Sequence, residues 1–317
     1  MTILIDPPAW PAHDTLWSHL VSDASHDELH AFAKRLGVPR RGFDLDHYDV
    51  PASLHERAVA LGARPVTAKE LLRGMQDAGP RVRQVDRGIM TPIRRREYLT
   101  AEWAALGEGF GIAAFERGEG SWRLLGDSLL ARWNEPHRRY HDERHLEDVL
   151  LSLDQLAVRG ERVSPATLLA AWFHDAVYAG TPSDELDSAQ LATESLSSFA
   201  LDAALLERVH AMIVATTPGR EEADPDPALA HLLDADLAIF AAPPHRYARY
   251  AAAVREEYAH VPDAEFAAGR ARILQAYLDR PAIYRTATAR GLWEHRARAN
   301  VAAELERLTG TEPEPEP

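Results

Sequence analysis

The chain has 317 residues, 35 basic and 49 acidic side chains, and a formal net charge of −14. This length favours two domains, and the negative charge argues against nucleic acid or anionic membranes as partners. Because the chain has no cysteine, disulfides, cysteine-ligated metals and thiol nucleophiles are excluded. No apolar run approaches the roughly 20 residues that span a bilayer. The start, MTILIDPPAW, lacks the basic region of a signal peptide, so we expect a cytoplasmic protein.

Residues 1–80 have the pattern of a small α/β domain. The apolar run ILI at 3–5 predicts a strand, which the following Asp-Pro-Pro ends. Helices are predicted over 25–36, 52–61 and 68–75. The first begins with Ser25 as N-cap and places Leu29, Phe32 and Leu36 at helical spacing.

Residues 81–120 are rich in Arg and Gly and only weakly periodic. They predict a linker with one short helix near 101–106. The basic run at 94–96 is compatible with nucleic-acid binding, but a solvated basic linker is the preferred interpretation on an acidic chain.

The remaining pattern is helical, which predicts an all-α domain over 121–310. The tail, 311–317 (TEPEPEP), has no apolar residue and is predicted to be disordered. The expected helices cover 121–134, 142–157, 165–178, 185–199, 202–216, 227–240, 244–258, 264–278 and 291–308.

Histidines and carboxylates gather in four segments of this helical domain: YHDERH (140–145), WFHD (172–175), DE (184–185) and LDADL (233–237). His141 and His145 are four residues apart, so they would share one face of a helix. His174 and Asp175 follow an apolar run and are expected at the end of a buried segment.

Asp236 is the least expected of these residues. On a wheel of 100° per residue that starts at Leu229, Asp236 falls at roughly −20°, inside the apolar stripe, whereas Asp234 falls near 140°, on the opposite side. A buried carboxylate is costly unless it is paired or binds a metal. Two histidines and two aspartates together suit a divalent ion of borderline softness. A solvated histidine pair and a helix-capping aspartate are the structural alternatives.

The helical domain resembles the HD superfamily of metal-dependent phosphohydrolases, and most closely its predicted bacterial phosphohydrolases, over residues 121–308. The stretches that carry the resemblance are NEPHRRYHDERHLEDVL (134–150), AAWFHDAVY (170–178), DELDSAQ (184–190), LLDADLAIF (232–240), YARYAAAVREEY (247–258), GRARIL (269–274) and RARANVAAEL (296–305).

The resemblance implies one divalent ion, with Mn favoured among Mn, Fe, Co, Ni, Zn and Mg. Its implied ligands are His145, His174, Asp175 and Asp236. His141 would protonate the leaving group, with Glu185 as the alternative acid. The candidates for binding the substrate phosphate are Arg138, Arg255, Tyr258 and Arg270.

Two departures from the family pattern are visible. Asp142 stands where the pattern has Asn, which adds negative charge beside the site. The segment after Thr216 lacks the histidine expected there, which argues for one metal ion rather than two.

The expected function is therefore a metal-dependent phosphohydrolase that acts on a nucleotide or another small phosphorylated metabolite. The alternatives are a non-catalytic nucleotide-sensing protein and an HD-fold iron oxygenase. Nucleic acid is disfavoured as a partner, no membrane association is expected, and a homo-oligomer is left open.

The first 80 residues resemble a small domain of unknown function found in actinobacteria and their phages, through ILIDPPAWPAHDTLWSHLVSD and FDLDHYDVP. No activity follows from this resemblance. His19 and Asp23, four apart, suggest a second metal site if this segment is helical. Aromatic core and turn caps are the alternative interpretation of the conspicuous residues Asp6, Trp10, His13, Trp17, His19, Asp46, His47 and Tyr48.

Overall fold

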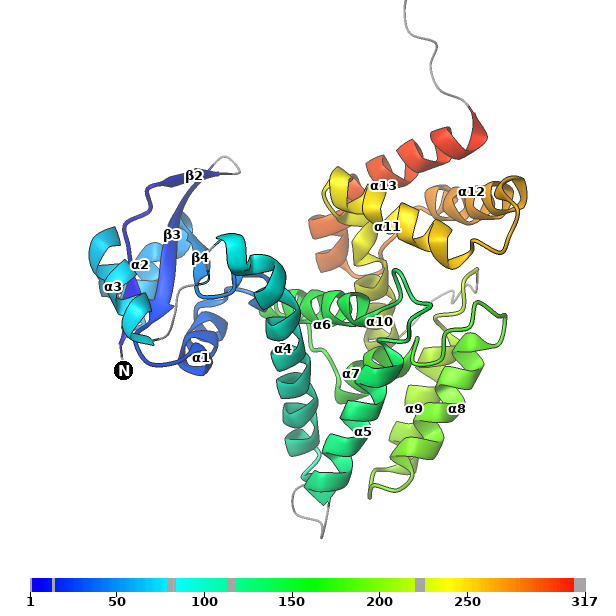
Figure 1. The fold of residues 1–317 in the computed structure, drawn as a ribbon, viewed down its shortest axis with the longest axis horizontal. Coiled ribbons are helices and arrows are strands. Elements are labelled where there is room, and N and C mark those ends of the chain that lie inside the picture. Colours follow the sequence, from blue (N-terminus) through cyan, green and yellow to red (C-terminus); the bar gives the residue numbers. More distant parts are fainter. Residues whose placement is uncertain are drawn as a thin grey trace, which may run out of the picture. The chain divides into compact units, whose positions relative to one another are not determined.

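The computed structural model describes residues 2–12, 15–78, 82, 84–112, 118–219 and 226–310 (Figure 1). It consists of two compact units. The N-terminal unit comprises residues 1–98 with 157–160, and the C-terminal unit comprises 99–156 with 161–317. A small α/β region followed by a helical region confirms the predicted fold class. The tail predicted to be disordered, 311–317, lies outside the described residues, as does His13.

The N-terminal unit is built around a five-stranded sheet. Its strands are β1 (Ile3–Ile5), β2 (Trp10–Ala12), β3 (Thr15–Ser22), β4 (Tyr48–Pro51) and β5 (Arg64–Pro65). The long strand β3 pairs antiparallel with β1, β2 and β4, while β5 is parallel to β1. The predicted strand at 3–5 is confirmed.

Helices cover both faces of this sheet, because side chains alternate between the faces along each strand. Helices α1 (His26–Leu36) and α2 (Ala52–Ala60) pack with Ile3, Ile5 and Leu20. Helix α3 (Ala68–Ala78) packs on the other face, with Leu4 and Val21. Ser25 caps α1 as predicted, since its hydroxyl accepts a hydrogen bond from the Glu28 backbone N–H.

The prediction of a linker over 81–120 with one short helix is wrong for much of that segment. After a short 3-10 turn, η2 (Gln84–Asp86), helix α4 runs from Arg87 to Gly109. The basic run contributes to this helix, since Arg94 pairs with Glu97 one turn later. Further along, Leu99, Trp103 and Leu106 recur at helical spacing and are buried. The many Arg and Gly residues obscured this period in the sequence.

The C-terminal unit is helical, as predicted. Helix α7 ends at Phe173, five residues before its predicted end, and α10 passes at Asp236 into the 3-10 helix η4 (Leu237–Ala241). No described helix is long and apolar enough to cross a membrane. The helices are α5 (Gly118–Arg132), α6 (Glu143–Val158), α7 (Pro165–Phe173), α8 (Asp184–Leu196), α9 (Ala203–Val214), α10 (Pro227–Asp236), α11 (Pro244–Glu257), α12 (Asp263–Asp279) and α13 (Ala287–Thr309).

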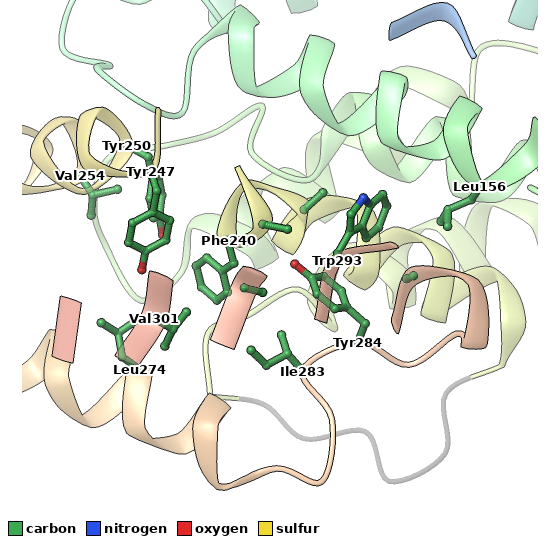
Figure 2. Packing of buried hydrophobic residues seen from close by; sticks show 14 residues of the cluster. Leu156, Phe240, Tyr247, Tyr250, Val254, Leu274, Ile283, Tyr284, Trp293 and Val301 are labelled. Atoms are coloured by element: carbon green, nitrogen blue, oxygen red, sulfur yellow. The ribbon is translucent and has the colours of Figure 1, made fainter. Parts of the chain in front are cut away.

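A large apolar cluster joins η4 and helices α11, α12 and α13 (Figure 2). Phe240 lies near the centre of this view, with Tyr247 and Tyr250 from α11 on one side and Trp293 on the other. The buried aromatic rings fix the end of α10, where Asp236 lies, against the three last helices.

A second packing centre joins α4 to α5. The rings of Trp103 and Trp122 stack with centroids 4.2 Å apart and an interplanar angle of 6°. Each indole N–H donates to the backbone carbonyl of the other residue, at 2.7 and 2.8 Å. Gly126 and Gly107 allow this arrangement, because a Cβ at either position would lie within 2.5 Å of an indole ring.

Candidate metal centre

The four residues proposed as ligands converge at one point of the C-terminal unit. The Nε2 atoms of His145 and His174 are 3.1 Å apart. Asp236 Oδ1 lies 3.1 Å from Nε2 of His145 and 3.5 Å from that of His174. Asp175 Oδ2 lies 3.5 and 3.3 Å from the same two atoms. We call these four residues the C-terminal His/Asp group.

Three separate elements position the group. His145 lies in the first turns of α6, and Asp236 is the last residue of α10. His174 and Asp175 follow α7, where the chain leaves the helix. Both imidazoles are buried, whereas the two carboxylates are partly exposed, so the group is closed on the histidine side and open on the aspartate side.

The orientation of His174 is fixed by its second ring nitrogen. Nδ1 lies 2.9 Å from the carbonyl oxygen of Ala171, so this nitrogen carries the N–H and donates. In the neutral ring, the lone pair is then on Nε2, which faces the group. A histidine held in this way is typical of metal ligands.

The spacing of the ligand atoms of His145, His174 and Asp236 suits a common ion. Ligand atoms at about 2.0–2.1 Å from one ion lie roughly 2.8–3.0 Å apart in cis octahedral positions and roughly 3.3–3.4 Å apart in tetrahedral positions. The three separations among these residues, 3.1, 3.1 and 3.5 Å, are close to these values. His145, His174 and Asp236 therefore form a group that could hold a metal ion.

The electrostatics of the group favour a cation. Burial by itself lowers the pKa of His174, but the negative charges of Asp175 and Asp236 outweigh it and raise the pKa to about 9. Burial would raise the pKa of Asp236, yet its contacts with the two histidines hold that pKa well below its ordinary value. Positive charge is thus stabilised at this point.

Asp234 was expected on the side of its helix opposite the apolar stripe, and in the structure that side is buried as well. Its side chain is fully buried, and it accepts hydrogen bonds from the backbone N–H groups of Arg285 and Thr286 and from the Thr286 hydroxyl. The wheel placed Asp234 correctly opposite Asp236, but a second layer of the fold covers that side of the helix. Its role is to fix the start of α13.

His141 lies beside the group but not on the helix that carries His145, because α6 begins only at Glu143. The ring centroids of the two histidines are 5.6 Å apart. Asp142 caps α6 by accepting from the Arg144 backbone N–H at 2.8 Å. The predicted proximity of the two histidines is therefore right, although the shared helical face is not.

Glu257, the last residue of α11, holds His141 in place. Its Oε1 accepts from the backbone N–H groups of Arg139, Tyr140 and His141 at 2.8–2.9 Å. Its Oε2 lies 2.7 Å from Nδ1 of His141. Burial would raise the pKa of Glu257, but the hydrogen bond and charge of His141 lower it to about 2.

Sequence reasoning missed Glu257. It lies in the run Arg255-Glu256-Glu257, which has the pattern of an exposed face with local ion pairs. No sequence signal distinguishes Glu257 from Glu256, whose side chain is 65% exposed against 2% for Glu257.

Two further residues border His141. The ring of Tyr178 stacks on it at 4.2 Å, and the Tyr178 hydroxyl donates to Glu257 at 3.2 Å. Tyr140 packs on His145 at 4.9 Å, and its buried hydroxyl has no hydrogen-bond partner among the described residues.

On α8, burial and then the charge of Asp175 raise the pKa of Glu185, so its carboxyl is close enough to the C-terminal His/Asp group to be affected by that charge.

The contacts of Arg138 do not support its predicted role in binding phosphate. Its guanidinium has no exposed surface. It donates to the backbone carbonyls of His141, Asp175 and Ala176 and pairs with Glu135. Arg138 instead fixes the two loops that carry His141 and Asp175.

Arg255, Tyr258 and Arg270 are likewise engaged with the protein. Arg255 donates to the carbonyls of Tyr258 and Val261 and pairs with Asp263. Arg270 pairs with Glu304 and donates to the Tyr250 hydroxyl. Among the described residues, the polar contacts of Arg255 are with Tyr258, Val261 and Asp263 rather than with the C-terminal His/Asp group.

Arg270 does lie in the electrostatic surroundings of the group. Burial and the charge of Asp236 raise the pKa of Tyr277, while Arg280, Arg285 and Arg270 act on it in the opposite direction. The charges of three arginines and of Asp236 therefore all act on one tyrosine of α12.

In comparisons with known proteins, the match that was found lies in the N-terminal unit. Residues 3–78 match the model of a family described as a protein of unknown function, DUF4031. No curated protein and no solved structure matches the chain. These comparisons give no support for an HD domain. The small α/β module of residues 3–78 is thus a DUF4031 domain, in agreement with the predicted domain of unknown function.

Proposed function

We propose that the C-terminal unit is a metal-dependent phosphohydrolase of the HD type that acts on a small phosphorylated metabolite, a nucleotide among the candidates. The observation that carries the proposal is that Asp175 and Asp236 each lie 3.1–3.5 Å from the Nε2 atoms of His145 and His174, next to the hydrogen-bonded pair His141–Glu257.

A divalent ion held by these four residues would supply Lewis-acid chemistry, polarising a phosphoryl oxygen and lowering the pKa of water. Imidazole and carboxylate ligands together suit Mn, Fe, Co, Ni, Zn or Mg, and Mn is the ion favoured by the family resemblance.

His141 acts as the proton donor to the leaving oxygen in this proposal. Its Nδ1 is bound by Glu257, which leaves Nε2 as the nitrogen for the substrate. Burial lowers the pKa of His141, but Glu257 and the nearby carboxylates raise it overall, which favours the protonated form that an acid needs. Glu185 is the alternative acid. Arg280 and Arg285, whose charges act on Tyr277 together with that of Asp236, replace Arg138, Arg255 and the Glu304-paired Arg270 as the proposed cations for the phosphate.

The test compares the wild type with Asp236→Asn and His141→Gln, and uses Asp142→Asn as matched control, since Asn can still cap α6. Metal per chain is measured by elemental analysis. Phosphate release is measured with Mn²⁺ on a panel of nucleoside phosphates, cyclic nucleotides and sugar phosphates.

We expect Asp236→Asn to bind one ion fewer than wild type and to lose turnover with it. His141→Gln keeps the ion but loses about 10²–10⁴-fold in turnover. Retention of this ion in Asp236→Asn would refute the ligand assignment. An ion without turnover on any substrate would refute the hydrolase and favour nucleotide sensing, or an iron oxygenase if oxygen is consumed.

A further inference from the structure

A second group of histidines and aspartates lies in the N-terminal unit, on the sheet face that carries α3. On this face α3 packs with Leu4 and Val21. Asp6 lies two residues after Leu4, and His19 lies two residues before Val21, so both side chains are on this same face. The Asp6 backbone N–H donates to the His19 carbonyl.

The neighbouring strand adds two more side chains to this face. His19 is paired directly with Asp49 across the β3–β4 ladder, so their side chains are neighbours. His47 precedes Asp49 by two residues and therefore points to the same side. Tyr48 and Val50, between and after them, are buried on the opposite face.

Each imidazole is held through its Nδ1 atom by a carboxylate. His19 Nδ1 lies 2.9 Å from Asp6, which also accepts from the His19 backbone N–H at 2.6 Å. His47 Nδ1 lies 2.6 Å from Asp46, which also accepts from the Val82 backbone N–H at 2.9 Å. Both carboxylates are thus fixed themselves.

The two Nε2 atoms face a third carboxylate. Asp49 Oδ1 lies 3.9 Å from Nε2 of His19 and 3.6 Å from Nε2 of His47. All three ligand atoms lie within 4.8 Å of one another. A histidine whose Nδ1–H is bound by a carboxylate has its lone pair on Nε2, which is the arrangement of carboxylate–histidine–metal sites.

We propose that His19, His47 and Asp49 bind a divalent transition-metal ion, with Asp6 and Asp46 as positioning residues. Two imidazoles and one carboxylate suit Zn, Mn, Fe, Co or Ni. Three protein ligands leave coordination positions open, which is typical of catalytic rather than structural sites. The open side faces solvent, because the Asp49 side chain is 45% exposed.

Charge and surroundings support a cation and an external ligand. Asp6, Asp46 and Asp49 bring three carboxylates to the two histidines. The ring of Trp10 lies 5.3 Å from that of His19 and is 53% exposed. An exposed indole beside open coordination positions is suited to contact a ligand of the ion.

This site replaces the earlier suggestion of His19 with Asp23. His19 lies in strand β3 rather than in a helix, so a spacing of four does not place the two side chains together. Asp23 instead accepts a hydrogen bond from the Thr2 backbone N–H.

The test uses the full chain in an Asp236→Asn background, which removes one proposed ligand of the other group. Zn²⁺ and Mn²⁺ binding to the chelator-treated protein is measured by calorimetry and elemental analysis. The added variants are His19→Ala, His47→Ala and Asp49→Asn, with His55→Ala on α2 as matched control. Circular dichroism checks that each variant is folded.

We expect one ion per chain in the Asp236→Asn protein and in the same protein with His55→Ala. In the three ligand variants, the affinity for Zn²⁺ and Mn²⁺ should fall at least ten-fold. Asp6→Asn weakens binding by about 10–100-fold. Co²⁺ quenches tryptophan fluorescence, and Trp10→Phe reduces this quenching at unchanged stoichiometry. No ion in the folded background, or an ion that all three ligand variants retain, would overturn the proposal. The absence of an ion in the background overturns only the N-terminal site, whereas an ion retained by all three variants also counts against Asp236 as a ligand of the C-terminal group.

Discussion

Replacing Glu257 by Gln removes the charge that holds His141 and keeps the size of the side chain. The side chain of Glu257 is 2% exposed and accepts hydrogen bonds from three backbone N–H groups through one oxygen. Gln can still accept from these groups through its carbonyl. Its NH₂ group would face Nδ1 of His141, where the protein now has a carboxylate, so the histidine loses the partner that sets its tautomer.

The size of the effect follows from the pKa. The pKa of Glu257 falls from an ordinary 4.5 to about 2, because the hydrogen bond and charge of His141 outweigh burial. At about 1.4 kcal/mol per unit, the ionised side chain contributes about 3 kcal/mol to the free energy of unfolding at pH 6. Because the folded pKa is the lower one, this contribution is lost as the pH falls, to about 1.4 kcal/mol at pH 3.

The assay is urea unfolding of wild type, Glu257→Gln and Glu256→Gln at pH 6 and pH 3, followed by far-UV circular dichroism. Glu256 is the matched control, since it is exposed and pairs with Arg139 only at 3.6 Å, which is worth under about 1 kcal/mol. Equal destabilisation by Glu257→Gln at both pH values, or no more than in Glu256→Gln, would refute the reasoning. Under the proposed function, Glu257→Gln also lowers turnover while metal content is unchanged.

Three further substitutions test the packing around the sites. Arg138→Gln leaves buried carbonyls without their donor and should cost about 3–5 kcal/mol in urea unfolding and weaken metal binding, as measured by calorimetry. Gly126→Ala forces a Cβ to 2.3 Å from the Trp103 ring and should cost about 1–3 kcal/mol, whereas Gly120→Ala on the same helix meets nothing and should be neutral or stabilising by melting temperature. Asp234→Ala should lower the melting temperature by removing about 1–3 kcal/mol of buried hydrogen bonding, with metal content unchanged.

The parts of the site that could be predicted are those encoded by local period. Asp236 stood out because an apolar stripe of one helix placed it on the buried side, and the strand at 3–5 and the helix starting at Ser25 have local signals of the same kind. Such signals need only the residues of one element. The early end of α7 had no comparable signal, although it is what brings His174 and Asp175 to the same point.

The parts that could not be predicted depend on contacts between distant segments. Glu257 meets His141 across 116 residues of chain, and nothing local to the run 255–257 selects it. Arg138 was a reasonable phosphate ligand as an isolated cation, but the fold surrounds it with carbonyl groups more than 35 residues away. The N-terminal group arises from the register of β3 with β4, which sequence spacing alone does not give.

The two His/Asp groups share one construction, although they lie in unrelated folds. In each, an imidazole Nδ1 is bound by an oxygen that belongs to the protein: a helix carbonyl for His174, and carboxylates for His19 and His47. That bond fixes the ring and directs the Nε2 lone pair toward a carboxylate, which another element contributes for His174 (Asp236) and for His19 (Asp49). A simple salt bridge needs no such control of the far nitrogen, because a protonated imidazole can donate from either side. Control of Nε2 is what a metal ligand requires, and it is therefore the feature on which both proposals depend.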